Sequence, residues 1–263
     1  MTEQTELLVP GPAEALGALL DVPVPDLDGG EALPLLWHWL YLLDRPAQAD
    51  LGPDGHPVRN TVVAPPAPGR RRMWAGGRVR TRGALRCGEP ATRRSTVLST
   101  QDKQGRSGPL TFVVVGHQIV QAGQVVVDEE QDIVYRPLGG ATTTEDGPVV
   151  PAAPDEWSIA ITPTLLFRFS ALTFNAHRIH YDRDYARDVE GYPGLLTHGP
   201  LQVLAMAEAA RARGSRGVAV FEYRLVAPLF DHQGLIVRAD SGTTSVRDRF
   251  GRQTATGTLR SSP

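Results

Sequence analysis

The chain has 263 residues and a formal net charge of -2, with 27 Lys and Arg against 29 Asp and Glu. This length permits one large domain or two domains of ordinary size. The nearly balanced charge provides no broad positive field for a phosphate polymer, which argues against a nucleic-acid partner.

The N-terminus and the single cysteine bear on location and redox chemistry. Residues 1–20 carry acids where a secretory signal carries a basic head, and they lack a long apolar segment. No apolar run approaches the roughly 18 residues that a membrane-spanning helix needs. We therefore predict a soluble, cytoplasmic protein without membrane contact. The single cysteine, Cys87, excludes an intrachain disulfide and favours a packing role.

The N-terminal half begins with residues 1–30, which are rich in Pro, Gly and Ala. We expect a weakly structured lead-in there, with a helical turn near Ala13 to Leu20. Leu33 to Leu43 reads LPLLWHWLYLL and is apolar nearly all round, which predicts a helix wrapped by other elements.

Four segments with strand composition follow in this half. They are Trp74 to Leu85, Thr92 to Thr100, Leu110 to Gln121 and Gln124 to Tyr135. The third contains TFVVVG, the least polar run of the half, and suits a central strand.

Residues 137–160 have no hydrophobic periodicity and predict a linker between domains at 31–136 and 161–263. The elements expected in the second domain are a short strand at Leu165 to Leu172, a helix at Pro200 to Arg213, and strands near Val218 to Val226, Leu235 to Gly242 and Thr254 to Leu259. One helix followed by antiparallel strands in each half predicts the α+β class.

The densest chemical signal is FSALTFNAHRIHYD, which contains Asn175, His177 and His180. A single histidine is more often a core or surface residue than a catalyst, but two histidines beside an Asn are harder to explain in that way. They could bind zinc. We predict no metal, because no cysteine is near and the H-E-x-x-H pattern is absent.

A second signal is His198-Gly199-Pro200, at the head of the predicted helix. Proline suits the first helical turn, and glycine lets another group approach the backbone closely. The N–H of Gly199 would point off the positive end of a helix dipole, where it could stabilise an oxyanion. By itself, the pair is more typical of an ordinary helix start.

Together these residues resemble the motif of the MaoC-like, hot-dog-fold enoyl-thioester hydratases. That motif has an Asp, an Asn and a His in a D-x-N-P-x-H run, and a His-Gly pair that opens the central helix. The resemblance assigns the catalytic histidine to His180 and the oxyanion-hole glycine to Gly199. His177 falls where the motif has Asn. Asn175 falls where it has the catalytic Asp, and an Asn cannot act as a base.

A closer resemblance accounts for this departure. TFNAHRIHYD and EGYPGLLTHGPLQ are similar to the subfamily of mesaconyl-C4-CoA hydratases and mitochondrial type 2 3-hydroxyacyl-thioester dehydratases, which has Asn at that position. Segments of the first half that resemble its N-terminal domain are WHWLYLL, LGPDGHP, RMWAGGR, SGPLTFV and EEQDIVYR. The similarity spans about Pro34 to Leu229. It implies a double hot-dog fold, in which two antiparallel sheets each wrap a central helix.

The resemblance implies a hydratase or dehydratase acting on enoyl or 3-hydroxyacyl thioesters. His180 would be the acid-base, its ring oriented by Asp182, while Gly199 would bind the enolate oxygen and Asn175 would position the water. No cofactor is expected beyond the coenzyme A or phosphopantetheine of the substrate, an acyl-CoA or acyl-carrier-protein thioester. A homodimer is compatible with this assignment.

Two other functions remain open. A hot-dog thioesterase normally needs a carboxylate facing the thioester, and TFNAHRIH contains none. A non-catalytic thioester-binding protein would fit the missing Asp, but it would have no reason to keep His180 together with the His-Gly pair.

The candidate substrate-binding residues are His177, Arg178 and His198. An arginine could bind the free carboxylate of a mesaconyl thioester with its bidentate fork. An equal alternative is that Arg178 points to solvent or pairs with Asp182 or Asp184.

The first half contains no counterpart of the histidine pair, so we expect it to shape the acyl pocket without chemistry. Its run Arg70-Arg71-Arg72 could contact the phosphates of coenzyme A. We favour a solvated face there, since most charge runs are of that kind.

Overall fold

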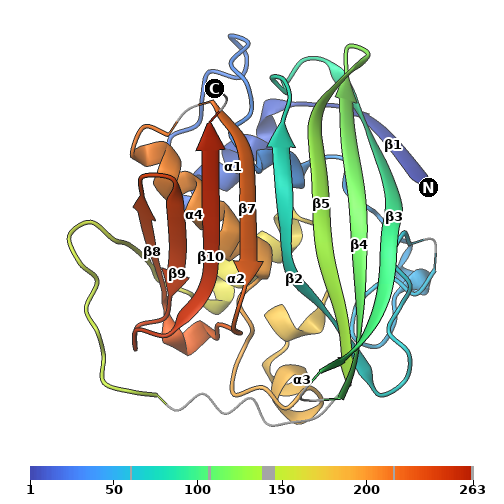
Figure 1. Ribbon diagram of the computed structural model, residues 1–263, viewed down its shortest axis with the longest axis vertical. Helices are drawn as coiled ribbons and strands as arrows, with labels where there is room; N and C mark the ends of the chain where they lie inside the picture. The colour runs from blue at the N-terminus through green and yellow to red at the C-terminus, as the bar shows by residue number, and fades with distance from the viewer. Residues whose placement is uncertain (60, 106–107, 138–145, 216, 262–263) are drawn as a thin grey trace.

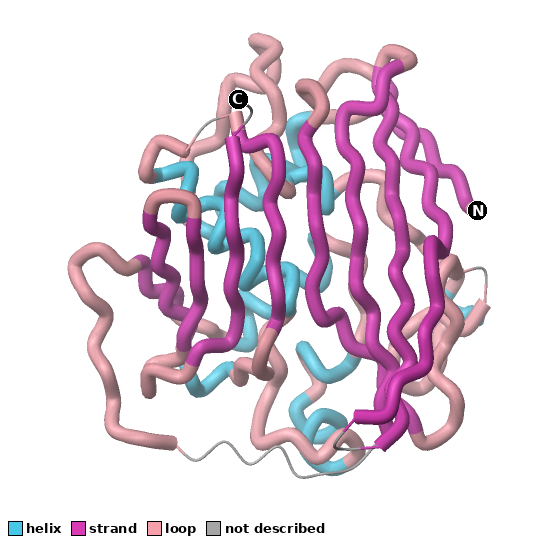
Figure 2. Tube along the Cα trace, in the orientation of Figure 1, coloured by secondary structure: helices cyan, strands magenta, loops and turns pink. Residues whose placement is uncertain are grey.

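The computed structural model describes residues 1–59, 61–105, 108–137, 146–215 and 217–261. Its strands form one antiparallel sheet (Figure 1) in the order β1-β3-β4-β5-β2-β7-β10-β9-β8-β6. Figure 2 shows the same arrangement, with the long helices on one side of the sheet. The strands from β1 to β2 in this order come from the N-terminal half, and those from β7 to β6 come from the C-terminal half. The predicted α+β class is confirmed.

The sheet of the N-terminal half contains all four strands that the sequence predicted, with shifted ends, and one strand that it did not. Their bounds are β1 Thr2–Leu7, β2 Arg70–Thr81, β3 Pro90–Gly105, β4 Gly108–Gln121 and β5 Gln124–Pro137. The strand with TFVVVG is β4, which lies between β3 and β5 as the central strand of this half.

The prediction of a long helix at Leu33 to Leu43 is wrong. Only the 3-10 turn η1, Trp37–Leu40, is helical there. Leu36 and Leu42 have positive φ angles of 71° and 55°, which end a right-handed helix on both sides of η1. The segment is buried all the same, since its apolar side chains belong to the hydrophobic core. The indole N–H of Trp37 donates to Glu208 at 2.7 Å.

The prediction of a weakly structured lead-in at residues 1–30 is also wrong. Strand β1 pairs with β3 of the N-terminal half, and α1, Pro10–Leu20, packs against α2 of the C-terminal half, so residues 1–30 include regular elements that contact both halves. Pro10 is at home in the first turn of a helix, and Leu16 is fully buried. The helical turn expected near Ala13 to Leu20 lies within α1.

The C-terminal half has the predicted helix and a strand pattern close to the prediction. Its strands are β6 Trp157–Ile159, β7 Val218–Leu225, β8 Leu235–Asp240, β9 Thr243–Arg247 and β10 Gln253–Ser261. The helix α4, Gly199–Ala212, confirms the prediction and packs against β8, β9 and β10. Of these strands, β6 and β9 were not expected.

The strand predicted at Leu165 to Leu172 is instead the helix α2, Pro163–Leu172. The hydroxyl of Thr162 accepts from the N–H of Leu165 and Pro163 occupies the first turn, which together form a helix start. The shorter helical elements are η2 Gln48–Asp50, η3 Arg178–His180, α3 Arg183–Asp188 and η4 Asp231–Gln233.

The two halves join edge to edge through β2 and β7. Gly76 lies opposite Arg224 and Gly77 opposite Tyr223. A Cβ on Gly77 would lie 2.5 Å from the Tyr223 hydroxyl, so glycine permits this approach. One hydrophobic core runs through both halves and includes Leu16 of α1 and Phe169 of α2.

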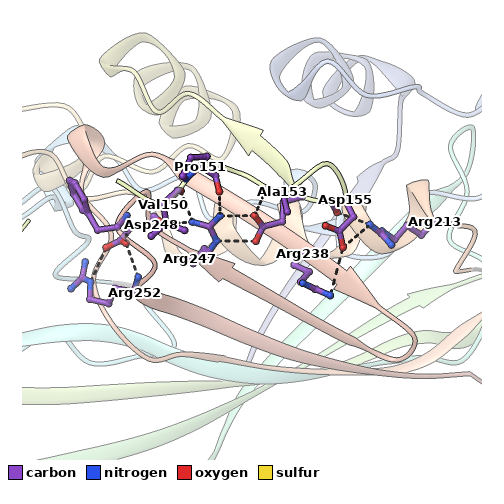
Figure 3. A network of polar contacts seen from close by, with 11 residues as sticks. Val150, Pro151, Ala153, Asp155, Arg213, Arg238, Arg247, Asp248 and Arg252 are labelled. Atoms are coloured by element: carbon purple, nitrogen blue, oxygen red, sulfur yellow. Dashed lines mark hydrogen bonds and ion pairs between the residues drawn. The ribbon is translucent and has the colours of Figure 1, made fainter. Parts of the chain in front are cut away.

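Part of the predicted linker is fixed to the C-terminal half. Arg247 donates to the carbonyls of Val150 at 3.2 Å and Pro151 at 3.0 Å (Figure 3). It also pairs with the buried Glu156 at 2.6 Å. Residues 138–145 of the predicted linker lie outside the described residues.

Two smaller expectations can be compared with the structure. Cys87 is buried, in agreement with a packing role. None of the described helices is long and apolar enough to span a membrane.

Candidate active site

A cavity of about 1000 Å³ is lined by residues of both halves. This volume is at the upper end of the range of small-molecule sites. The C-terminal half contributes four of the predicted site residues, namely Asn175, His177, His180 and Gly199.

His180 is held in η3 with its ring almost fully buried. Its Nδ1 lies 2.7 Å from the carbonyl oxygen of Leu196 and therefore donates to it, which leaves Nε2 unprotonated. Burial lowers the pKa of His180 to about 4, so the imidazole is neutral at pH 7. A neutral imidazole with a fixed tautomer is suited to accept a proton.

Asp182 does not orient this ring as we had expected. Its carboxylate accepts from the N–H of Tyr185 at the start of α3 and pairs with Arg178. The backbone carbonyl of Leu196 takes the orienting role instead.

His198 is fully buried behind His180 and does not line the cavity. The two rings stack with centroids 3.7 Å apart and an interplanar angle of 19°. Nε2 of His198 shares a hydrogen bond of 2.8 Å with the hydroxyl of Ser170. The expected contact of His198 with substrate is therefore not supported, and its position suits support of the His180 ring.

Asn175 and His177 lie beside each other on the cavity wall. The side-chain oxygen of Asn175 accepts from the backbone N–H of His177 at 3.0 Å, which leaves the side-chain NH₂ group as its donor. The ring of His177 meets that of His180 edge to face, with centroids 5.4 Å apart. Burial and the neighbouring cations and histidines keep the pKa of His177 well below its usual value.

Arg178 does not line the cavity either. Its guanidinium donates to Asp182 at 2.7 and 3.0 Å and to the carbonyl of Pro53 at 3.0 Å. Of the two alternatives that the sequence left open, the structure has the pairing with Asp182. Arg178 therefore stabilises the loop, and the prediction that it recognises a substrate carboxylate is not supported.

Gly199 is the first residue of α4 and lines the cavity. Its N–H cannot be satisfied within the helix, and Pro200 has no N–H to offer. A Cβ at Gly199 would overlap the side chain of Leu225, which lines the same cavity. Glycine thus permits the close approach of Leu225 to the helix start.

The N-terminal half contributes a histidine that sequence reasoning missed. The ring of His56 lies 3.9 Å from that of His177, centroid to centroid. Its Nδ1 shares a hydrogen bond of 2.9 Å with the carboxylate of Asp54. The expectation that this half lacks a counterpart of the histidine pair is therefore wrong. An acid two residues before a histidine, in the turn LGPDGHP, was the available signal.

The loop that carries His56 is docked directly on the histidine segment. The N–H of Arg178 donates to the carbonyl of Asp54 at 2.9 Å. Gly55, at φ +87°, approaches the backbone of Ala176 so closely that a Cβ would overlap it. Among the described residues, Asp54, His56 and His177 form the one group whose possible metal-ligating atoms lie within 4.8 Å of one another.

A second buried polar cluster lines the cavity in the N-terminal half. The carboxylate of Glu129 accepts from His38 at 2.9 Å, from Trp39 at 3.0 Å and from Gln131 at 2.8 Å. Burial would raise the pKa of Glu129, but the hydrogen bond and charge of His38 outweigh burial and lower it to about 2. Because both oxygens are engaged, this carboxylate is poorly suited to be the nucleophile or base of a thioesterase.

The run Arg70-Arg71-Arg72 is not the solvated face that we favoured. All three residues are half-buried and line the cavity. Arg70 donates to the carbonyl of Tyr135 at 2.9 Å, and Arg71 donates to the hydroxyl of Tyr192 at 2.6 Å.

Comparison with known proteins shows the family of the chain. The model of the family "hydroxyacyl-thioester dehydratase type 2" matches residues 36–231. A mesaconyl-C(4)-CoA hydratase of Chloroflexus aurantiacus is 48% identical over 221 residues, which cover 83% of this chain and 79% of that protein.

Solved structures agree with the fold. HtdX of Mycobacterium tuberculosis superimposes with a TM-score of 0.66 at 14% identity, covering 99% of this chain and all of that one. A second M. tuberculosis protein, described as having a double hotdog fold, gives a TM-score of 0.56 at 15% identity and covers 97% of this chain and 92% of its own. The predicted double hot-dog fold is confirmed.

Proposed function

Because the chain belongs to the hydroxyacyl-thioester dehydratase type 2 family, we propose that it adds water reversibly to the double bond of an enoyl thioester. The observation that carries the proposal is a neutral, oriented imidazole, that of His180, in one cavity with the helix-start N–H of Gly199. Hydration needs a base for the water, a proton for the α carbon and a donor for the enolate oxygen.

The reaction uses these groups in sequence. Nε2 of His180 takes a proton from water as the water oxygen bonds to the β carbon, and the electron pair of the double bond shifts toward the thioester oxygen. The N–H of Gly199 donates to that oxygen. His180 then returns its proton to the α carbon. A positioned acid-base contributes about 10²–10⁴ in rate, and an oxyanion donor contributes about 3–4 kcal/mol.

Asn175 positions the attacking water in this scheme. Its side-chain oxygen is engaged by the backbone of His177, so the NH₂ group is left to donate to the water oxygen. An amide does not ionise, and the base role therefore stays with His180.

The similarity to the Chloroflexus protein supports a small dicarboxylic acyl group as the substrate. That protein is named for mesaconyl-C(4)-CoA, and we extend this substrate class to the present chain. Coenzyme A or phosphopantetheine enters as part of the thioester, and the chemistry described uses groups of the protein alone. The cytoplasmic location and a homodimer stay predictions.

The test is an assay of the purified protein with mesaconyl-C4-CoA and with crotonyl-CoA. We expect loss of the enoyl absorbance and formation of the hydroxyacyl-CoA, with no free CoA released. Release of free CoA would identify a thioesterase. Binding without any turnover would identify a non-catalytic thioester-binding protein.

A further inference from the structure

The cavity contains a cation that the hydration step does not use. Arg72 of β2 is half-buried and lines the cavity together with His56 and His177. Withdrawing a guanidinium from water is costly unless an anion or strong acceptors compensate it. Burial accordingly lowers the pKa of Arg72 from its usual value.

The surroundings of Arg72 supply little compensation. Among the residues that the structure describes, no carboxylate lies within 4.0 Å of its guanidinium, in contrast to Arg71, which reaches Glu190 at 4.0 Å. The phenol of Tyr135 interacts with Arg72 but carries no charge.

Asp54 is the nearby acid, and it is engaged elsewhere. One of its oxygens accepts from the backbone N–H of His56 at 2.9 Å, and the other shares the ring hydrogen bond of the same residue at 2.9 Å. Asp54 acts on Arg72 only as a more distant charge. The guanidinium has five N–H donors, so its hydrogen bond to Tyr135 leaves others for a carboxylate partner.

The position of Arg72 matches a particular substrate atom. Arg72 lines the same cavity as His56 and His177. Its charge is one of the causes, after burial, that lower the pKa values of these two histidines. In a four-carbon enedioic thioester, the free carboxylate is bonded to the β carbon. The β carbon is also the atom that receives the water next to His180. A carboxylate receptor for such a substrate must therefore lie beside the acid-base histidine.

We propose that Arg72 binds the free carboxylate of an enedioyl thioester and makes the enzyme selective for dicarboxylic over monocarboxylic acyl groups. This inference rests on the proposed function. It transfers the carboxylate contact expected of Arg178 to a cation that lines the cavity, and it anchors the substrate at both ends, with the thioester oxygen at Gly199 and the carboxylate at Arg72.

The test is Arg72→Leu, assayed with mesaconyl-C4-CoA and with crotonyl-CoA. We expect kcat/KM for the dicarboxylic substrate to fall by at least roughly 30-fold, as for truncation of one member of a buried charge pair. Crotonyl-CoA has no carboxylate, so its kcat/KM should change less than about threefold. Arg72→Lys keeps the charge without the fork and should retain part of the selectivity.

Arg80→Leu is the matched control. Arg80 is another half-buried arginine of β2, but it pairs with Glu130 at 3.1 Å and does not line the cavity. Its replacement should leave the ratio of the two kcat/KM values unchanged. Thermal unfolding and the crotonyl-CoA rate of Arg72→Leu verify that this variant folds. If Arg72→Leu does not fold, the kcat/KM values for the two substrates are compared in Arg72→Lys and Arg72→Gln instead.

Two results would overturn the inference. One is an equal loss of kcat/KM for both substrates in Arg72→Leu. The other is a wild-type enzyme that hydrates crotonyl-CoA as efficiently as mesaconyl-C4-CoA, which leaves the hydratase function intact. Absence of hydration with either thioester would instead refute the proposed function itself.

Discussion

At the scale of residues, the site is a row of four imidazoles in ring contact. The ring of His56 is tilted against that of His177, His177 meets the edge of His180, and His180 stacks on His198. Burial is the largest cause that lowers the pKa of each, and protonation of one disfavours protonation of its neighbours. The row is therefore neutral at pH 7 and can accept one proton during the reaction.

Within the row, His180 and His177 are predicted to differ in their importance. His180→Ala should lower kcat by at least roughly a hundredfold, because the general acid-base is lost. His177→Asn should keep a substantial fraction of activity, because the role of this side chain is to orient and not to transfer a proton. Steady-state kinetics on both variants, with circular dichroism to verify folding, makes the comparison.

The role assignment has a clear counter-result. If His177→Asn is as inactive as His180→Ala while both variants fold normally, the two imidazoles act as a coupled pair. The hydrogen bond from His180 to Leu196 would then not be sufficient to fix the base.

The predicted site residues that line the cavity are those with local sequence signals. Asn175, His177 and His180 lie in one short segment, and Gly199 opens a helix with its own start signal. His56 and Arg72 could not be assigned in this way, because their neighbours in space come from distant parts of the chain. Arg178 was misassigned because its partner Asp182, four residues away, was only one of several candidates.

At the scale of elements, α4 and η1 differ in whether local sequence or distant contacts decide their conformation. The helix α4 has a Pro in its first turn and a long Ala- and Leu-rich run, so local preference and packing agree. The aromatic segment around Trp37 is buried by distant contacts with Glu208 and Glu129, and its backbone has no need to be helical. Apolar composition predicted its burial correctly and its conformation wrongly.

The loop from Leu51 to Pro57 is the element through which the N-terminal half reaches the site. We predict that Gly55→Ala lowers kcat/KM strongly, because an added Cβ would overlap the backbone of Ala176 and displace His56. Gly88→Ala is the matched control. Gly88 has a φ of +86° and Gly55 a φ of +87°, so an added Cβ strains the backbone similarly at both positions, but at Gly88 no atom lies within 4 Å of the new Cβ. Kinetics and thermal unfolding of both variants provide the measurement.

The two glycine variants separate backbone strain from docking. Both should lose a similar, small amount of stability from the positive φ angle. Only Gly55→Ala should also lose activity. Similar activity losses in the two variants would attribute the loss to backbone strain, and full activity of Gly55→Ala would show that the close approach of the loop to Ala176 is not required for the reaction.

At the scale of the whole molecule, the site depends on both halves being joined. The continuous sheet through β2 and β7 fixes the N-terminal cavity wall against the C-terminal histidines. Neither half contains by itself both the acid-base of the reaction and Arg72. The double architecture could be predicted from the similarity that spans the two halves, whereas the contacts across the cavity depend on a tertiary arrangement that no local pattern encodes.

The whole molecule also carries an unusual number of buried neutral histidines, and these should make it sensitive to acid. Five histidines have a pKa below the ordinary value, with burial as the largest cause in each case. They are His56, His117, His177, His180 and His198. In the unfolded chain each would titrate near pH 6.5. Below that pH the unfolded state therefore binds more protons than the folded state.

We predict that the free energy of unfolding is nearly constant from pH 8 to 7 as far as these groups are concerned, and that it falls as the pH decreases below about 6.5. Each proton bound only by the unfolded chain contributes about 1.4 kcal/mol per pH unit to this slope.

His117, which bonds Ser95 at 2.7 Å in the N-terminal half, lies apart from the histidine row and offers a direct check. His117→Gln keeps a hydrogen-bonding side chain but does not titrate. The free energy of unfolding of this variant should therefore fall less steeply between pH 6.5 and 5, by up to the contribution of one proton. Urea unfolding at several pH values measures both slopes. A wild-type stability that stays constant, or rises, from pH 6.5 to 5 would mean that these imidazoles are protonated in the folded protein, and the neutral-base role of His180 would have to be abandoned with them.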